Sequence, residues 1–92
     1  MKIISRRDKL KIYGDILSIL HSEAKEDKVI LTRVQLKTNV PFDRLKSYLG
    51  DLEELGLIKQ EPAISLTKKG EQYLTEYKKV QEFLDWLGLS YS

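Results

Sequence analysis

The sequence predicts a mainly α-helical fold with one small β-hairpin, and three observations support this class. Apolar residues recur at helical spacing over most of the chain. Between residues 57 and 66 the pattern becomes extended and is interrupted by a proline. The last stretch keeps an average spacing of 3.5 residues, which is typical of a helix that pairs with another helix. The 92 residues suffice for one continuous domain, with a head over residues 1–66 and a C-terminal helix over residues 67–92.

The first predicted helix runs from Ser5 to about Ala24. Serine often caps helix N-termini, and Asp8 three residues later is a weak capping-box partner. An apolar stripe at 3-4-3 spacing follows, which indicates an amphipathic helix with one face against a core. The stripe consists of Leu10, Tyr13, Leu17 and Leu20, with Ile12, Ile16 and Ile19 beside it.

A short helix, a turn and a second amphipathic helix are predicted between residues 29 and 56. Residues 29–31 are β-prone and are expected to form a sheet edge, after which Thr32 caps a helix over residues 33–37. Pro41 fits the first turn of the next helix, where its missing N–H loses no hydrogen bond, and Gly56 fits a left-handed terminator. This order is a helix-turn-helix. The second helix directs Phe42, Leu45, Leu49, Leu52 and Leu55 to the core, with Tyr48 alongside.

Residues 57–59 and 64–66 are predicted to pair as a two-stranded hairpin. Pro62 belongs at its tip because proline cannot donate a hydrogen bond to a strand ladder. Thr67 is then expected to cap the final helix.

The final helix carries apolar residues at 4-3-4-3-4 spacing, the pattern of a coiled-coil seam. Alternatively, the seam packs against its own domain. One domain face could bury Tyr73 and Leu74 but hardly the apolar residues further along a helix of roughly 30 Å. Because such an exposed apolar area is unusual on a monomer, the pattern favours a homodimer. The predicted dimer interface comprises Tyr73, Tyr77, Val80, Phe83, Leu84, Trp86, Leu87 and Tyr91.

Charge is distributed unevenly along the chain. The formal net charge is only +2, but residues 1–46 carry 11 Lys/Arg against 6 Asp/Glu, whereas residues 47–92 carry 5 against 8. A basic half joined to an acidic half indicates that one end faces a polyanion, although an asymmetric solvated surface is the alternative. The high charged content of 33%, with no cysteine and one asparagine, is typical of a thermophile source.

Four motifs follow one another along the chain, namely Ile12-Tyr13-x-Asp15-Ile16-Leu17, Asn39-x-x-Phe42-x-x-Leu45-x-x-Tyr48-Leu49, Leu52-x-x-x-Gly56-Leu57-Ile58 and Leu66-Thr67-x-x-Gly70. Their order and spacing resemble those of the winged helix-turn-helix proteins of archaea. The chain resembles in particular the small "10a" chromatin and DNA-binding proteins of Sulfolobus-type archaea, over about residues 10–75.

The resemblance implies a winged helix-turn-helix head followed by a long C-terminal coiled-coil dimerisation helix. It also implies a dimer paired through antiparallel C-terminal helices, with two heads that bind duplex DNA with little sequence preference. Two features depart from the family pattern: the final helix is short, and Pro41 stands where a polar cap is expected.

The second helix of the helix-turn-helix is the expected reader of the major groove. If its apolar residues face the core, Asp43, Arg44, Lys46 and Ser47 face outward. Arg44 could bind a guanine bidentately or a phosphate, Lys46 a phosphate, and Ser47 either. Asp43 fits the favourable interaction of an acid with a helix N-terminus.

Further DNA contacts are expected from cations at helix starts. Arg6, Arg7, Lys68 and Lys69 are predicted in first turns, where a cation opposes the helix dipole at roughly 0.3–1 kcal/mol, so a bound phosphate would explain them. Each is otherwise a solvated surface charge. The remaining candidates are Lys2 as a basic arm, Arg33, Gln35 and Lys37 on the short helix, and Lys59 on the hairpin.

The sequence offers no catalytic or metal-binding pattern, so we expect no enzyme, metal, cofactor or small-molecule ligand. His21, the single histidine, is expected to be structural. No apolar run of bilayer length and no secretory leader is evident, which predicts a soluble cytoplasmic protein associated with the nucleoid.

Three functions remain open at this point. Duplex DNA binding in an architectural role is favoured slightly over a sequence-specific transcriptional regulator, because no ligand-sensing domain is evident. The third, from another class, is a winged-helix protein-interaction module of a larger assembly. That module would need an apolar reader face, whereas Arg44, Lys46 and Ser47 make this face polar.

Overall fold

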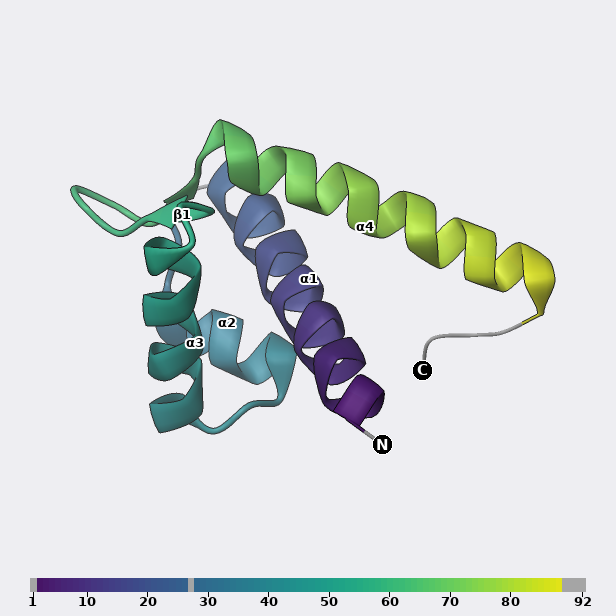
Figure 1. Ribbon diagram of the computed structural model, residues 1–92. Helices are drawn as coiled ribbons and strands as arrows, with labels where there is room; N and C mark the ends of the chain where they lie inside the picture. The colour runs from purple at the N-terminus through teal and green to yellow at the C-terminus, as the bar shows by residue number, and fades with distance from the viewer. Residues whose placement is uncertain (1, 27, 89–92) are drawn as a thin grey trace.

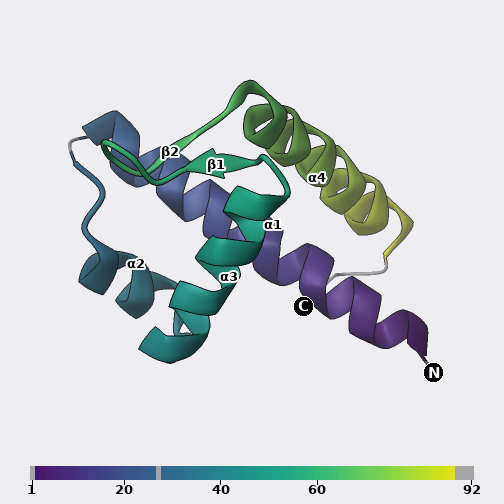
Figure 2. The same ribbon diagram turned by 60° about the vertical axis from the view of Figure 1, so that its left-hand side comes forward.

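The structure is a computed structural model that describes residues 2–26 and 28–88, with side chains from residue 9 onward. The elements in chain order are α1 (Lys2–Glu26), α2 (Leu31–Thr38), α3 (Phe42–Glu54), β1 (Ile58–Lys59), β2 (Ser65–Leu66) and α4 (Lys68–Leu87). Helix α1 lies between the α2–α3 pair on one side and α4 on the other, as both views show (Figures 1 and 2). The predicted class, mainly helical with one hairpin and a long final helix, is confirmed.

Helix α1 is longer than predicted at both ends. It begins at Lys2 instead of Ser5 and continues to Glu26. No glycine or proline precedes Ser5, so nothing in residues 2–4 prevents the helix from starting earlier. Arg6 and Arg7 consequently lie in the second turn, where the helix dipole no longer argues for a phosphate.

The strand predicted at residues 29–31 does not form. Residues 28–30 are irregular, and Leu31 already opens α2. The carbonyl oxygen of Ile30 accepts hydrogen bonds from the backbone N–H groups of Arg33 at 3.0 Å and Val34 at 3.1 Å, so it serves the helix instead of a sheet. Thr32, the predicted cap, therefore lies inside α2.

The turn between α2 and α3 confirms the helix-turn-helix. Asn39 ends α2 in the left-handed conformation at φ 59°, and its N–H donates to the Gln35 carbonyl at 2.9 Å. Pro41 occupies the N-cap of α3 instead of its first turn, and its carbonyl accepts from the N–H of Leu45 at 2.9 Å. Since an N-cap needs no helical backbone, Pro41 fits there as well as in the predicted position.

The hairpin and its flanking caps are also as predicted. Gly56 ends the α3 segment with a φ of +80°, and β1 pairs antiparallel with β2 in the register Ile58 to Leu66. Thr67 caps α4, because its hydroxyl accepts from the N–H of Gly70 at 3.1 Å. The same hydroxyl donates to the Gly56 carbonyl at 2.6 Å and so fastens the start of α4 to the end of α3.

All four helices and the hairpin contribute residues to the core. It is lined by Ile16, Leu17 and Leu20 of α1, Val34 of α2, Leu45, Leu49 and Leu52 of α3, the hairpin residues Leu57 and Ile58, and Leu74 of α4. Phe42 and Leu55, both expected in the core, remain 39% and 49% exposed at the two ends of α3.

Candidate nucleic-acid interface

The outward face of α3 is polar along most of its length. Because Leu45, Leu49 and Leu52 are buried, the residues between them point away from the core. Arg44 and Ser47 are exposed, as predicted, and neither makes a hydrogen bond or ion pair with another described residue. Both side chains are therefore available to a partner. Asp43, also exposed, lies in the first turn, where an acid is favourable.

Lys46 is held toward the start of α3 by an aromatic ring. Its Nζ lies 5.8 Å from the centroid of the Phe42 ring, one helical turn away, in a cation–π contact. The partial exposure of Phe42 thus places a cation next to the N-terminal half of the reader helix, which is the half expected to enter a groove.

Gly50 is a further candidate for the polar face of α3 that the sequence analysis did not single out. A Cβ built at this position would meet no atom within 4 Å, so no packing requires a glycine there. Gly50 lies on the exposed face of α3 with Asp43 and Ser47, seven and three residues away, and a mid-helix glycine costs roughly 0.5–1 kcal/mol relative to alanine. The sequence signal for this position is a single glycine inside a helical pattern. Because glycine has no side chain, a ligand could approach the backbone of α3 closely there.

Arg33 and Lys37 of α2 are exposed but already paired. The carboxylate of Glu23 on α1, 5% exposed, accepts from Lys37 Nζ at 2.5 Å and lies 3.4 Å from Arg33 Nε. The hydrogen bond from Lys37 lowers the pKa of Glu23 below its usual value; burial opposes this shift, and the charges of Arg33 and Lys37 add to it. Glu23 therefore offsets one of the two positive charges that Arg33 and Lys37 would present to DNA.

Of the other predicted cations, one is hydrogen-bonded within the protein and two have no partner among the described residues. Lys69 Nζ donates to the Leu55 carbonyl at 2.8 Å and so caps the end of α3. Lys68 at the start of α4 and Lys59 on β1 are exposed, without a hydrogen bond or ion pair to any described residue. Gln35 is half-buried beside the helix-turn-helix turn.

Lys2, Arg6 and Arg7 belong to the end of α1 that points away from the hairpin in both views (Figures 1 and 2). Their side chains lie outside the described residues. The structure therefore brings Arg44, Lys46 and Ser47 together on α3 and leaves these three positions separate from that helix.

Two tyrosines, Tyr13 and Tyr48, hold α3 against α1. The Tyr13 hydroxyl donates to Asp51 Oδ2 at 3.1 Å, and the rings of Tyr13 and Tyr48 pack edge to face at 6.0 Å. Desolvation, followed by the hydrogen bond to Asp51 and the charge of that carboxylate, raises the pKa of Tyr13. These contacts fix the orientation of the polar face relative to the rest of the head.

The predicted seam on α4 falls into two halves. Tyr77 is only 4% exposed, with its ring over Gly14 of α1, and the Tyr73 hydroxyl donates to the Leu10 carbonyl at 3.1 Å. The second half projects beyond the head with Leu84 half-buried. Its exposed apolar residues are Val80, Phe83, Trp86 and Leu87. Tyr91 lies outside the described residues.

No group of three His, Cys, Asp or Glu side chains in the described part of the chain is arranged to hold a metal ion. Within the same residues, no helix combines the length and hydrophobicity needed to cross a bilayer. His21 is half-buried on α1, next to Lys25 and facing α4.

Comparison with known proteins identifies the family. Residues 6–85 match the winged helix-turn-helix family, and the chain belongs to it. No curated protein and no solved structure matches the chain. A winged helix-turn-helix domain suggests DNA binding, and domains of this class are typically not enzymes.

Proposed function

We propose that the protein binds duplex DNA as a homodimer, with α3 of each head in the major groove and most of the affinity from phosphate contacts. The exposed polar face of α3 carries this proposal. It presents Arg44, Lys46 and Ser47 from one helix whose other side is fixed in the core. We also propose an architectural, nucleoid-associated role with low sequence preference. Kinship with the "10a" proteins and an archaeal thermophile source are further parts of this proposal.

The charges of the head set the expected salt dependence. Four exposed cations without an ion pair to another described residue surround the hairpin and α3, namely Arg44, Lys46, Lys59 and Lys68. Each phosphate contact contributes about 0.9 to the slope of log K against log salt, so two heads with four contacts each give a slope of about −7. Binding then weakens about 10⁴-fold between 50 and 200 mM salt.

Self-association is supported by the second half of α4. Trp86 is 78% exposed and Phe83 57% exposed, and their rings stack at a centroid distance of 6.3 Å. Large adjacent rings left in water on a small domain are typical of an interface. A two-fold dimer would present two α3 helices to one duplex.

Fluorescence anisotropy of a random-sequence duplex of about 30 base pairs tests the proposal, with protein titrated at several salt concentrations. The wild type is expected to bind at micromolar concentration or below, with a steep salt slope and little change between shuffled duplexes. Arg44→Ala should reduce the slope by about 2 per dimer, one contact per head. Lys78→Ala, which removes an exposed cation from α4, is the matched control and should bind like the wild type.

The other outcomes separate the alternatives. Tight binding of one duplex only would indicate a sequence-specific regulator. Equal loss in Arg44→Ala and Lys78→Ala would show that net charge, and not the face of α3, governs binding. An absence of binding at low salt would refute the proposal and favour a protein-interaction module.

A further inference from the structure

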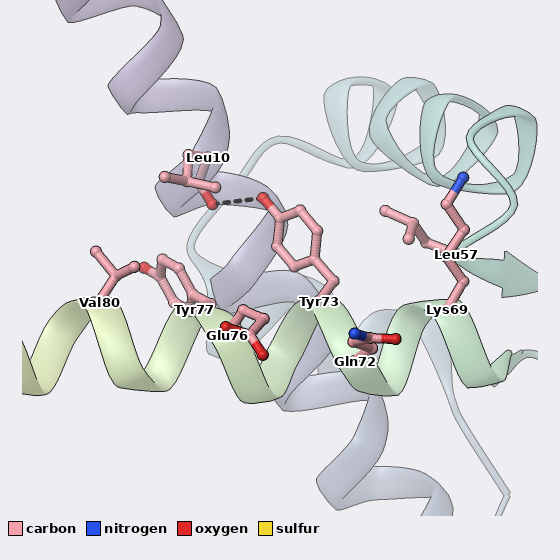
Figure 3. A pocket seen from close by; sticks show the side chains of 8 residues that line it. All are labelled: Leu10, Leu57, Lys69, Gln72, Tyr73, Glu76, Tyr77 and Val80. Carbon is pink, nitrogen blue, oxygen red and sulfur yellow. Dashed lines mark hydrogen bonds between the residues drawn. The ribbon is translucent and has the colours of Figure 1, made fainter.

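Large apolar side chains are exposed in two regions of the described part of the chain. One region lies around the apolar hollow between α1 and α4, which Tyr73 and Val80 line (Figure 3), and it continues into the α4 surface proposed above for self-association. The other region is the helix-turn-helix, where Leu36 of α2 is 79% exposed and Phe42, the first residue of α3, is 39% exposed. The dimer proposal does not account for an exposed apolar ring at the start of the reader helix.

Phe42 lies at the border between the buried face and the outward face of α3. It precedes Leu45 of the core by three residues and the exposed Lys46 by four, so it shares one side of the helix with both. Lys46 Nζ is 5.8 Å from the centroid of its ring. The core therefore covers only part of the ring, and the rest remains in water at the end of α3 that is expected to enter a groove.

Pro41 fixes the backbone next to this ring. At the N-cap of α3 it has a φ of -56°, and its carbonyl accepts from the N–H of Leu45 at 2.9 Å. Since the pyrrolidine ring restricts φ, the chain enters α3 along a defined path. Pro41 is itself exposed and has no hydrogen-bonding side chain, so Pro41 and Phe42 form a small apolar surface before the polar part of α3.

The major groove of B-form DNA displays one methyl group, the C5-methyl of thymine. The other groups by which base pairs differ there are hydrogen-bond donors and acceptors, which a phenylalanine side chain cannot bind. The thymine methyl group, in contrast, is a suitable partner for phenylalanine. Leu36 is more exposed than Phe42 but lies on α2, the helix that crosses the DNA backbone, where base edges are out of reach.

We propose that the Phe42 ring contacts the C5-methyl group of a thymine in the major groove, so that each head prefers a T·A pair at one position. This inference rests on the duplex DNA binding proposed above and names the base group that α3 recognises. Lys46 lies over the same ring, so a phosphate contact of its ammonium group positions the ring on the duplex, and the methyl contact adds the preference. A single apolar contact leaves the affinity dominated by phosphates, in keeping with a low overall sequence preference.

Duplexes that differ only in this methyl group test the inference. Anisotropy titrations at one salt concentration compare an alternating dA–dT duplex of about 20 base pairs with the same duplex in which uracil replaces every thymine. Uracil lacks the methyl group but keeps the hydrogen-bonding groups of the base pair. Burial of one methyl group corresponds to about a fourfold change in affinity, so the uracil duplex should bind about fourfold more weakly through one head and about 15-fold more weakly through both heads of a dimer.

Three variants assign the methyl contact to a residue. Phe42→Ala should bind the thymine and uracil duplexes with nearly equal affinity, because the ring that distinguishes them is gone. Leu36→Ala, which removes the other exposed apolar side chain of the helix-turn-helix, is the matched control and should keep the wild-type ratio. Arg44→Ala should weaken binding to both duplexes and also keep the ratio. Phe42→Gln, which fills similar space with a polar side chain, replaces Phe42→Ala should the latter not fold.

The outcomes separate failure of this inference from failure of DNA binding. If the wild type binds both duplexes with equal affinity, the methyl contact does not exist and only the inference fails. If the wild type binds neither duplex at low salt, the proposed function fails as well. A ratio that is lost in Leu36→Ala but kept in Phe42→Ala would assign the contact to α2 and overturn the inference.

Methylated cytosine separates the methyl group from the shape of A·T-rich DNA. An alternating dG–dC duplex is titrated with and without a methyl group at C5 of every cytosine, which places the same substituent in the same groove on the other base pair. Methylation should tighten binding of the wild type by about the factor that uracil removes, and should leave Phe42→Ala unaffected. An effect of uracil without an effect of cytosine methylation would show that duplex shape is recognised, and would overturn the inference.

Discussion

Replacing Glu23 by glutamine tests directly whether its carboxylate keeps Arg33 and Lys37 from binding phosphates. Glu23 is 5% exposed and binds both Lys37 and Arg33, so its carboxylate offsets one of their two positive charges. Glutamine keeps the size and a hydrogen-bonding group but removes the charge. Helix α2, which carries both cations, is the first helix of a helix-turn-helix, the one that crosses the DNA backbone.

The expected change in the salt dependence of DNA binding follows from counterion release. Two released cations per head add about 0.9 each to the salt slope, so Glu23→Gln should steepen it by about 1.8 per head. Over a fourfold increase in salt this amounts to an additional loss of affinity of about tenfold per head. At low salt the variant should bind DNA more tightly than the wild type, because two more phosphates can be neutralised.

Anisotropy titrations at four or more salt concentrations measure this slope. Glu26→Gln, the same substitution three residues later on α1 at an exposed position, is the control and should leave the slope unchanged. A slope for Glu23→Gln equal to that of the wild type would refute the reasoning, since Arg33 and Lys37 would then be either remote from phosphate or not restrained by Glu23.

Four further predictions concern stability and titration. Gly50→Ala should raise the free energy of unfolding by about 0.5–1 kcal/mol in chemical denaturation and should weaken DNA binding. Gly14→Ala should lower the free energy of unfolding by about 1–3 kcal/mol, because the added Cβ would displace the Tyr77 ring. Glu23, whose folded pKa is lowered, contributes stability above its usual value of 4.5 that is lost as the pH falls through the lowered pKa; acid denaturation of Glu23→Gln should lack this component. The raised pKa of Tyr13 predicts stability that is complete below its usual value of 10.0 and lost as the pH rises through the raised value. Tyr13→Phe should therefore remove a late-titrating component from the tyrosine absorbance at alkaline pH.

Local signals predicted the elements that depend on neighbouring residues. Gly56 supplies the left-handed conformation that ends the α3 segment, and Thr67 caps the first turn of α4. Both roles depend only on residues close in sequence, and both were correctly predicted. The apolar period of α3 identified its buried face for the same reason. The strand predicted at residues 29–31 does not form because Leu31 already belongs to α2 and the carbonyl of Ile30 accepts hydrogen bonds from that helix.

Features that depend on distant contacts could not be predicted. The pairing of Glu23 with Arg33 and Lys37 joins residues 10 and 14 positions apart on different helices, so charge counting alone treated these cations as free. Likewise, the spacing of the α4 seam does not show where the head stops covering it. The boundary lies between Tyr77, whose buried ring packs over Gly14 of α1, and the exposed Val80.

The most direct test of DNA binding through α3 is an NMR titration of the wild-type chain with a short duplex at low salt. Amide signals of residues 43–50 are expected to shift most, with smaller shifts at Lys59 and Lys68 and none at residues 80–87 beyond those of dimerisation. Shifts confined to the exposed end of α4, or no shifts at all, would contradict the proposed interface.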